Sequence, residues 1–313
     1  MSYYLGIDTS NYTTSLSLFN DANNEVLSEK MLLPVKKGEK GIRQSDAVFH
    51  HTVQLPQLFE NLFKNHNIRD IKAIGVSTKP SNQENSYMPC FLTGISVSKA
   101  LSLAMNIPLY EFSHQDGHIV SALYSCNQLK FIKKDFIAFH ISGGTSQVVL
   151  VHPDNDYFTT EIISDSLDLK AGQAIDRVGV MMGLQFPCGP EIEKLALSYN
   201  DNLQKNKIYR KNGFFSLSGI ENQCKKMYDD GICNEQIAHH CLSSIYSAIK
   251  DTIIEIQNSY GKLPLVFSGG VMSNSLIRNM IKNEFDSYFA EPYFSSDNAC
   301  GIAILSSICD KKE

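Results

Sequence analysis

Apolar and polar positions alternate in two similar stretches of the chain that begin about 130 residues apart. The first is YYLGIDTSNYTTSLSLF near the N-terminus, and the second is FIAFHISGGTSQVVLVH from Phe136. In each stretch, two alternating runs flank a turn rich in small and hydroxylated residues, which predicts a β-hairpin. The recurrence predicts two similar lobes in sequence, although hairpins with small-residue turns also recur by chance.

Helical periodicity follows each hairpin. The predicted helices are 46–64, 91–105, 114–124, 169–182, 190–198, 235–257, one that begins after Ser273, and one that begins at Asp297. Short apolar runs predict strands at 73–77, 107–112 and 263–268, whereas segment 200–232 is polar and predicts irregular structure.

This order of strands and helices predicts an α/β fold of two lobes. We expect the first lobe to span residues 1–134 and the second to span 135–296, with a C-terminal helix, 297–313, that completes the first lobe. At 313 residues and 43% hydrophobic content, the chain can fill a core in each lobe.

Composition narrows the class of protein. There is no uncharged apolar run of about 18 residues and no leader-like N-terminus, so we expect a cytoplasmic protein without a membrane span. The eight cysteines form no C-x-x-C pair, which predicts reduced thiols. The net charge is −5, and the basic residues are dispersed apart from Lys36, Lys37, Lys40 and Arg43. If RNA is a substrate, partner proteins are expected to supply part of its binding surface.

The two hairpin turns offer groups that suit phosphate oxygens. In GIDTSNYTTS the turn carries hydroxyl groups from Thr9, Ser10, Thr13 and Thr14, and Asp8 is a candidate to hold a metal or order a water. An ordinary hairpin with a hydroxyl-capped turn is the alternative interpretation. In HISGGTSQ, paired glycines allow an anion to approach the backbone closely.

A third glycine pair lies in FSGGVMSN, between an apolar strand and a predicted helix, where a flat ligand or a phosphate can reach the helix N-terminus. Two phosphate hairpins followed by such a loop are the order typical of actin-like ATPases. We therefore predict an actin-like ATPase fold that binds an adenine nucleotide or an adenylate in the cleft between its lobes.

Two histidines in SHQDGHIV have the spacing of metal ligands. His114 and His118 are four residues apart, so both imidazoles project from one face of a helix and can bind one divalent ion. Neutral imidazole suits zinc or iron. A pair of histidines without a metal is the alternative. The adjacent pairs His50–His51 and His239–His240 fail this geometric test.

Seven short motifs occur in one order between residues 114 and 299: HQDGH, SGGTSQ, AIDR, FPCGP, FSLSG, SGGVMSN and SSDNA. In this set the chain resembles the catalytic subunit family of tRNA N6-threonylcarbamoyladenosine synthase, long called O-sialoglycoprotein endopeptidase or glycoprotease. The resemblance implies two ribonuclease-H-like lobes and transfer of a threonylcarbamoyl group from an adenylate to adenosine N6 of tRNA, with AMP as the leaving group. The sequence shows no Ser-His-Asp or H-E-x-x-H arrangement that would support a protease.

The same resemblance implies the site residues. His114, His118 and Asp297 would bind one iron or zinc ion, and we assign catalytic roles to Asp8 and Asp297. ATP, AMP or a carbamoyl-adenylate would contact a second set: His140, Ile141, Ser142, Gly143, Gly144, Asp176, Gly189 and Asn274. In this set a carboxylate suits ribose hydroxyls, a glycine admits the sugar, and an amide suits polar base or ribose edges. Protein partners of the threonylcarbamoylation system are also expected.

Some positions depart from the family pattern. Tyr12 and Thr13 stand where the family carries an acidic pair, Thr145 follows the glycines of the second hairpin in place of a histidine, and Cys188 replaces a glycine. The stretch Lys79 to Pro89 replaces a glycine-rich loop. These changes favour a paralogue with the same cleft and another acceptor.

Two other classes of function stay open at this point. One is a nucleotide-dependent phosphotransferase or ATPase that uses Asp8 as a general base or to organise a metal-bound water, although phosphoryl transfer through magnesium needs no H-x-x-x-H pair. The other is a non-catalytic nucleotide-binding partner of modification enzymes, which the altered loops favour and the retained candidate ligands oppose.

Overall fold

The computed structural model describes residues 2–10, 12–34, 42–64, 66–155, 157–199, 206–211 and 213–311. Contacts divide the chain into two compact units: unit 1 holds Met1–Lys130, Asp154–Phe158 and Tyr293–Glu313, and unit 2 holds Phe131–Pro153 and Thr159–Pro292. Three lysines of the basic cluster, Lys36, Lys37 and Lys40, lie outside the described residues.

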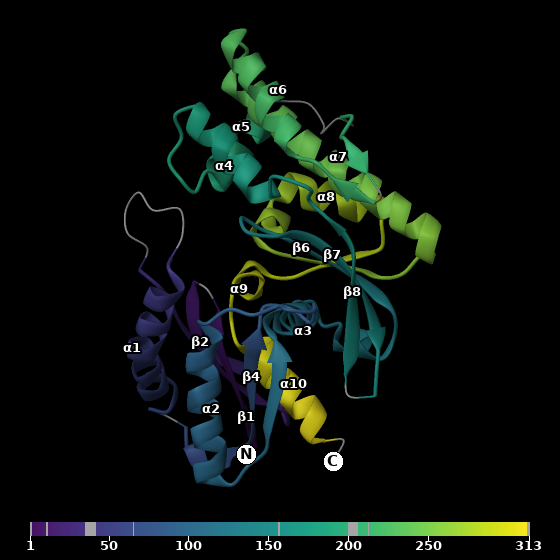
Figure 1. Ribbon diagram of the computed structural model, residues 1–313. Helices are drawn as coiled ribbons and strands as arrows, with labels where there is room; N and C mark the ends of the chain where they lie inside the picture. The colour runs from purple at the N-terminus through teal and green to yellow at the C-terminus, as the bar shows by residue number, and fades with distance from the viewer. Residues whose placement is uncertain are drawn as a thin grey trace. The chain divides into compact units, whose positions relative to one another are not determined.

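Unit 1 is built on a five-stranded sheet with the order β3-β2-β1-β4-β5 (Figure 1). Its strands are β1 (Tyr3–Ser10), β2 (Thr13–Asn20), β3 (Glu25–Leu32), β4 (Ile71–Lys79) and β5 (Leu109–Ser113). Strand β1 pairs antiparallel with β2 and parallel with β4. Its helices are α1 (Gln44–Leu62), η1 (Ile68–Asp70), α2 (Phe91–Met105), α3 (His114–Ser125) and α10 (Cys300–Asp310), with the short α9 (Pro292–Ser295) at its boundary.

Successive side chains of β1 point to opposite faces of the sheet and therefore contact different helices. Thr9 faces α2, because its hydroxyl accepts from the Gly94 N–H over 3.2 Å. Gly6 and Asp8 face the opposite side, where α10 and α3 pack. The sheet of unit 1 is therefore covered by helices on both faces.

Unit 2 repeats the strand order of unit 1. Its sheet runs β12-β11-β6-β7-β8, in which β6 pairs antiparallel with β7 and parallel with β11. The strands are β6 (Phe136–Ile141), β7 (Ser146–Pro153), β8 (Phe158–Asp165), β11 (Leu265–Ser268) and β12 (Ser287–Phe289). In both units the hairpin and the parallel neighbours of its first strand occupy the same places, which confirms the predicted two-lobed α/β architecture.

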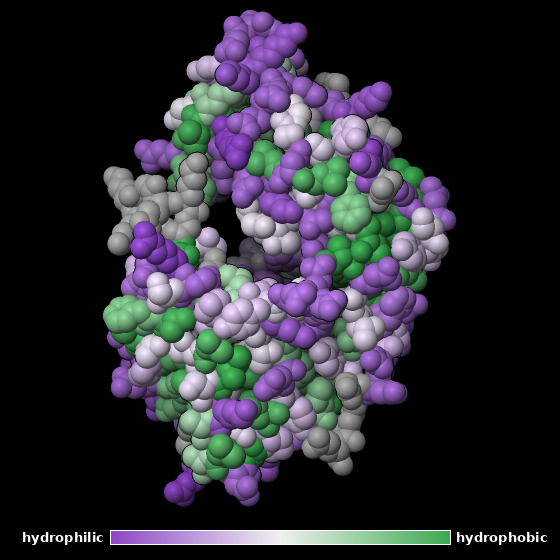
Figure 2. Space-filling model, in the orientation of Figure 1, coloured by the Kyte–Doolittle hydropathy of each residue, from purple (hydrophilic) through white to green (hydrophobic). Residues whose placement is uncertain are grey.

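The helices of unit 2 surround a large apolar core. They are η2 (Leu129–Lys133) at its boundary, α4 (Ala171–Met181), α5 (Gly189–Ser198), α6 (Ser218–Asp229), α7 (Asn234–Tyr260), η3 (Gly270–Ser273) and α8 (Ser275–Glu284). A small separate sheet joins β9 (Arg210–Lys211) and β10 (Phe214–Phe215). Figure 2 shows hydrophilic side chains over the end of α6 and the start of α7, at the top of the view.

Two predicted elements need correction. The polar segment 200–232 was expected to be irregular, but it contains α6, whose Ile220 and Cys224 are buried in the core of unit 2. A single buried stripe on a polar helix explains why overall polarity misled the prediction. The last helix begins at Cys300, so Asp297 lies in the loop before it. None of the helices in the described part of the chain combines the length and apolar character needed to span a bilayer.

Close backbone packing holds α10 against unit 1's sheet. A Cβ atom on Gly6 would lie 2.4 Å from the Ala299 carbonyl oxygen, and one on Gly75 would lie 2.6 Å from the Ile302 carbonyl oxygen. Since real Cβ contacts are not this short, only glycine allows the helix to lie this close.

Gly6→Ala is expected to lower the free energy of unfolding by about 1–3 kcal/mol, because the added methyl group must push α10 away from the sheet. Gly219→Ala in α6 is the matched control, because a Cβ atom there meets no atom within 4 Å. It should leave stability unchanged or raise it by about 0.4–1 kcal/mol. Urea unfolding of both variants measures the difference, and a Gly6→Ala protein as stable as the wild type would contradict this packing.

Candidate functional site

Three side chains of unit 1 converge into a group with metal-ligand chemistry. His114, His118 and Asp297 each offer one ligand atom, and the three atoms lie within 4.8 Å of one another. The Asp297 Oδ1 atom is 3.3 Å from Nε2 of His118 and 3.7 Å from Nε2 of His114. Two imidazoles and one carboxylate fit a zinc or iron ion, with positions left open for other ligands.

Helix α3 aims the two histidines. Ser113 caps the helix in a capping box with Asp116, so that His114 is the first helical residue and His118 lies one turn later on the same face. Asp116 is fully buried and also accepts hydrogen bonds from Asn82 and from the Tyr157 hydroxyl. The start of α3 is thus held by three segments of unit 1.

Asp8 lies behind His114. Its fully buried carboxylate accepts a hydrogen bond from Ser10 over 3.1 Å and another from Ser77, and it lies 3.0 Å from Nδ1 of His114. A carboxylate on Nδ1 keeps the proton there and directs the lone pair of Nε2 toward a metal. At this distance the Asp8 carboxylate can orient the His114 ring.

The carboxylates also determine the charge of the cluster. Burial lowers the pKa of His114, but Asp8 and Asp297 outweigh this effect and raise the pKa to about 10. Burial raises the pKa of Asp297, and the neighbouring imidazoles of His114 and His118 bring it well below its ordinary range. Without a metal, His114 is therefore an imidazolium between two carboxylates.

The hydroxyl groups of the first hairpin are engaged within the protein. Thr9 donates to the Cys90 carbonyl oxygen, and Thr14 bonds to His51 and Gln54, both on the face away from the cluster. The prediction that these two hydroxyls face a phosphate is therefore wrong, since alternation along the strands turns them toward α1 and α2. Thr13 does face the cluster, 3.4 Å from Oδ2 of Asp297.

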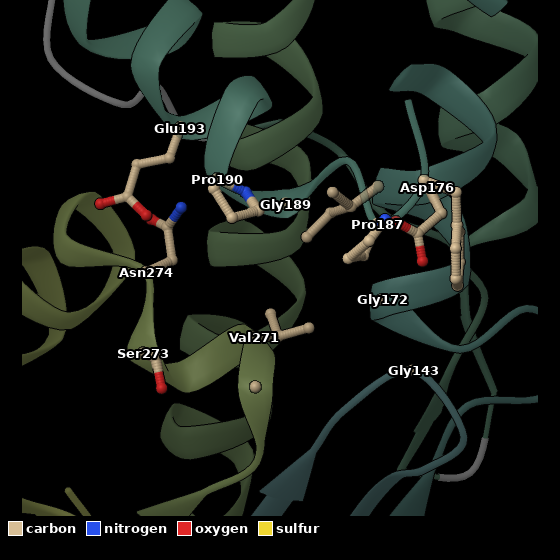
Figure 3. A pocket seen from close by; sticks show the side chains of 13 residues that line it. Gly143, Gly172, Asp176, Pro187, Gly189, Pro190, Glu193, Val271, Ser273 and Asn274 are labelled. Atoms are coloured by element: carbon tan, nitrogen blue, oxygen red, sulfur yellow. The ribbon is translucent and has the colours of Figure 1, made fainter. Parts of the chain in front are cut away.

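Unit 2 contains a pocket of about 440 Å³ beside its own hairpin turn (Figure 3). Four residues predicted to bind a nucleotide line it: Gly143, Asp176, Gly189 and Asn274. Of the other predicted residues, His140 bonds through Nδ1 to Ser268 and Ile141 is buried in the core. Ser142 braces the hairpin turn by accepting from the Thr145 N–H, and Gly144 is exposed beside it.

Asp176 and Asn274 lie on opposite sides of this pocket (Figure 3). Asp176 accepts from the Cys188 N–H over 2.8 Å, and burial raises the pKa of its carboxyl. Asn274 caps α8 by accepting from the Ile277 N–H, so its Nδ2 amide group is the part that can still donate.

Phe186, Ile175 and Glu193 are among the lining residues that sequence reasoning missed. Phe186 lines the pocket although the residue is 74% exposed, and Ile175 adds apolar surface. Glu193 stands beside Asn274 and accepts from the Ser275 N–H over 2.8 Å. Phe186 is the first residue of the FPCGP motif, and Glu193 lies in α5 three residues after the end of that motif. Their place in or near the motif was the signal that could have identified them.

Comparison with known proteins finds full-length relatives. The profile of the tRNA N6-adenosine threonylcarbamoyltransferase (TsaD) family matches residues 24–304. The enzyme of that name from Bacillus subtilis is 28% identical over 328 residues, covering 99% of this chain and 91% of the relative. The one from Thermosipho melanesiensis is 32% identical over 322 residues, covering 96% and 92%.

Solved structures share the fold at low identity. Full-length HypF in its phosphate- and nucleotide-bound form has a TM-score of 0.61 at 15% identity, covering 99% of this chain and 55% of that chain. The Acidaminococcus fermentans (R)-2-hydroxyglutaryl-CoA dehydratase component A has a TM-score of 0.56 at 14% identity, covering 99% and 100%. These likenesses confirm the predicted actin-like ATPase fold.

Metal affinity should rise with pH, because a metal ion must displace the proton that His114 holds. With the pKa of His114 near 10, one proton is released on binding throughout the neutral range. The apparent Kd for Zn²⁺ or Co²⁺ should therefore fall about tenfold per pH unit between roughly pH 6 and 8. Competition titration with a chelating indicator measures this slope.

Asp8→Asn tests whether the proton released on metal binding comes from His114. The substitution removes a carboxylate that raises the pKa of His114, so the slope should flatten toward neutral pH. Equal slopes in the variant and the wild type would show that the released proton comes from another group.

Proposed function

The chain belongs to the TsaD family of tRNA N6-adenosine threonylcarbamoyltransferases, and from this premise we propose that it transfers a threonylcarbamoyl group from an adenylate donor to an adenosine amine of tRNA in a metal-dependent reaction. It is a transferase and not a protease. The convergence of His114, His118 and Asp297 from two distant segments is the observation that carries the metal-dependent part of the proposal.

The donor's adenylate end occupies the pocket of unit 2. Asp176 accepts hydrogen bonds from ribose hydroxyls, and the Asn274 amide donates to a polar edge of the nucleotide. The open backbone at Gly143 admits phosphate oxygens, because no atom lies within 4 Å of where its side chain would be. Phe186 offers a ring face to the base.

The reaction itself exchanges one bond for another. The N6 amine of adenosine attacks the carbamoyl carbon, and a C–N bond forms. The bond between the carbamoyl carbon and the phosphate oxygen breaks, and AMP leaves with the bonding pair. The amine loses one proton to solvent. A metal ion held by His114, His118 and Asp297 would supply Lewis-acid polarisation and orientation of donor oxygens. Asp8 orients His114 in this arrangement.

The surroundings of Asp8 argue against a phosphotransferase that uses this residue as its general base. Asp8 is fully buried, and hydrogen bonds from Ser10 and Ser77 and its contact with His114 engage both oxygens. A general base must reach the proton it abstracts. The altered residues Tyr12 and Thr145 and the altered loop Lys79–Pro89 keep another acceptor as the alternative for the paralogue.

Adenine nucleotides should bind the pocket of unit 2 and raise the thermal midpoint. Asp176→Ala and Phe186→Ala should each weaken AMP binding by about tenfold, through lost ribose hydrogen bonds and lost ring contact. Isothermal titration calorimetry measures the Kd. Asp229→Ala, at an exposed carboxylate of α6, is the control that should bind AMP like the wild type. Unchanged affinity in both pocket variants would move the nucleotide site elsewhere.

The function is tested by reconstitution with threonine, bicarbonate, ATP, the enzyme that forms threonylcarbamoyl-adenylate, partner subunits and unmodified tRNA. Nucleoside mass spectrometry should detect threonylcarbamoyladenosine, and His114→Ala should reduce its formation at least about 100-fold. His152→Ala is the matched control, because it removes an exposed histidine that pairs with Asp135.

Two results would contradict this proposal. Consumption of the adenylate without tRNA product would indicate a different acceptor, as expected of a paralogue. Full activity of His114→Ala would exclude the metal-ligand cluster from the reaction.

A further inference from the structure

Two buried polar side chains, those of Ser121 and Asn298, lie next to the group formed by His114, His118 and Asp297. Ser121 in α3 is fully buried, and Asn298, the residue after Asp297, is 4% exposed. The Ser121 hydroxyl donates to Asn298 Oδ1 over 3.0 Å and accepts from the Gly301 N–H over 2.9 Å. One serine therefore joins the helix that carries both histidines to the segment that carries the aspartate.

The Asn298 side chain is also bonded at its other end. Its Nδ2 group donates to the carbonyl oxygens of Ser296, over 2.6 Å, and Phe294, over 3.3 Å, while Oδ1 accepts a second bond from the Cys300 N–H. An amide is the side chain that can accept and donate in this way at once. These bonds close the loop around Asp297 from both sides.

The spacing along α3 places this anchor on the ligand face. Ser121 follows His114 by seven residues and His118 by three, so the three side chains share one side of the helix. At 1.5 Å per residue, the serine stands about 10 Å along the axis from His114. The helix thus presents two ligands and one anchor to a single loop.

Backbone contact keeps α10 from sliding relative to α3. A Cβ atom on Gly301 would lie 1.9 Å from the Gly117 carbonyl oxygen and 2.9 Å from the Ser121 backbone nitrogen. The loop that carries Asp297 is therefore held in two ways: by the close packing of Gly301 in α10 against α3, and by the Ser121–Asn298 hydrogen bond.

We propose that Ser121 and Asn298 are positioning residues of the metal site, which hold Asp297 Oδ1 against the Nε2 atoms of His114 and His118. Neither touches the metal or the reacting atoms. Their effect is to keep a loop carboxylate in place without help from the metal ion. This inference rests on the metal site of the proposed function.

The test uses Co²⁺ as the probe in the full-length protein, because its d–d absorption reports the coordination geometry. Ser121→Ala and Asn298→Ala should each raise the Kd for Co²⁺ on the order of tenfold and alter the d–d spectrum. Ser306→Ala is the matched control, since it removes another buried serine hydroxyl, which bonds the Ala303 carbonyl oxygen elsewhere in α10. It should bind Co²⁺ with the affinity and spectrum of the wild type.

A metal-free crystal structure of Ser121→Ala separates this inference from the metal site itself. The distance from Asp297 Oδ1 to His118 Nε2, 3.3 Å in the wild type, should increase. A displaced Asp297 supports the positioning role of Ser121 even if the wild type binds no Co²⁺. Failure of the wild type to bind Co²⁺ would contradict only the metal site. Wild-type affinity and spectrum in both variants, or an unmoved Asp297 in the crystal, would overturn the positioning role.

Discussion

The packing of α10 against β1, β4 and α3 is the constraint on which the metal-ligand cluster depends. Gly6, Gly75 and Gly301 each lie where a side chain would strike the backbone of a neighbouring element. Interiors packed to this density shift in discrete steps and do not deform smoothly. The position of Asp297, three residues before α10, therefore follows from backbone contacts made along the helix.

Charge balance is the second constraint on the cluster. Two carboxylates, the fully buried Asp8 and the partly buried Asp297, lie close to His114, and leaving them without a positive partner would be costly. Protonation of His114 provides that charge in the absence of a metal, and a divalent ion would provide it when bound. The proton on His114 thus stabilises the metal-free protein, and a metal ion must displace this proton to bind.

The two units share a strand order but use their hairpins differently. In unit 1 the strand residues of the hairpin are buried: Asp8 and Thr13 contact the ligand cluster, and Thr9 and Thr14 bond to residues of helices or their ends. In unit 2 the turn at Gly143 is exposed and borders a pocket. One topology therefore carries a group of candidate metal ligands in one unit and a pocket beside its hairpin turn in the other.

The sequence by itself determined the local elements, the two-lobed α/β class and the family, because these depend on periodicity, turn residues and short motifs. It also placed His114 and His118 on one helical face, since their spacing alone decides that. The family resemblance named Asp297 as their partner, but only the tertiary structure shows it beside them. The tertiary structure alone also shows that Thr9 and Thr14 point away from the site. It also revealed Phe186 in the pocket and Ser121 beside Asn298. Those contacts join residues up to about 180 positions apart, and they depend on how helices pack, which no local pattern encodes.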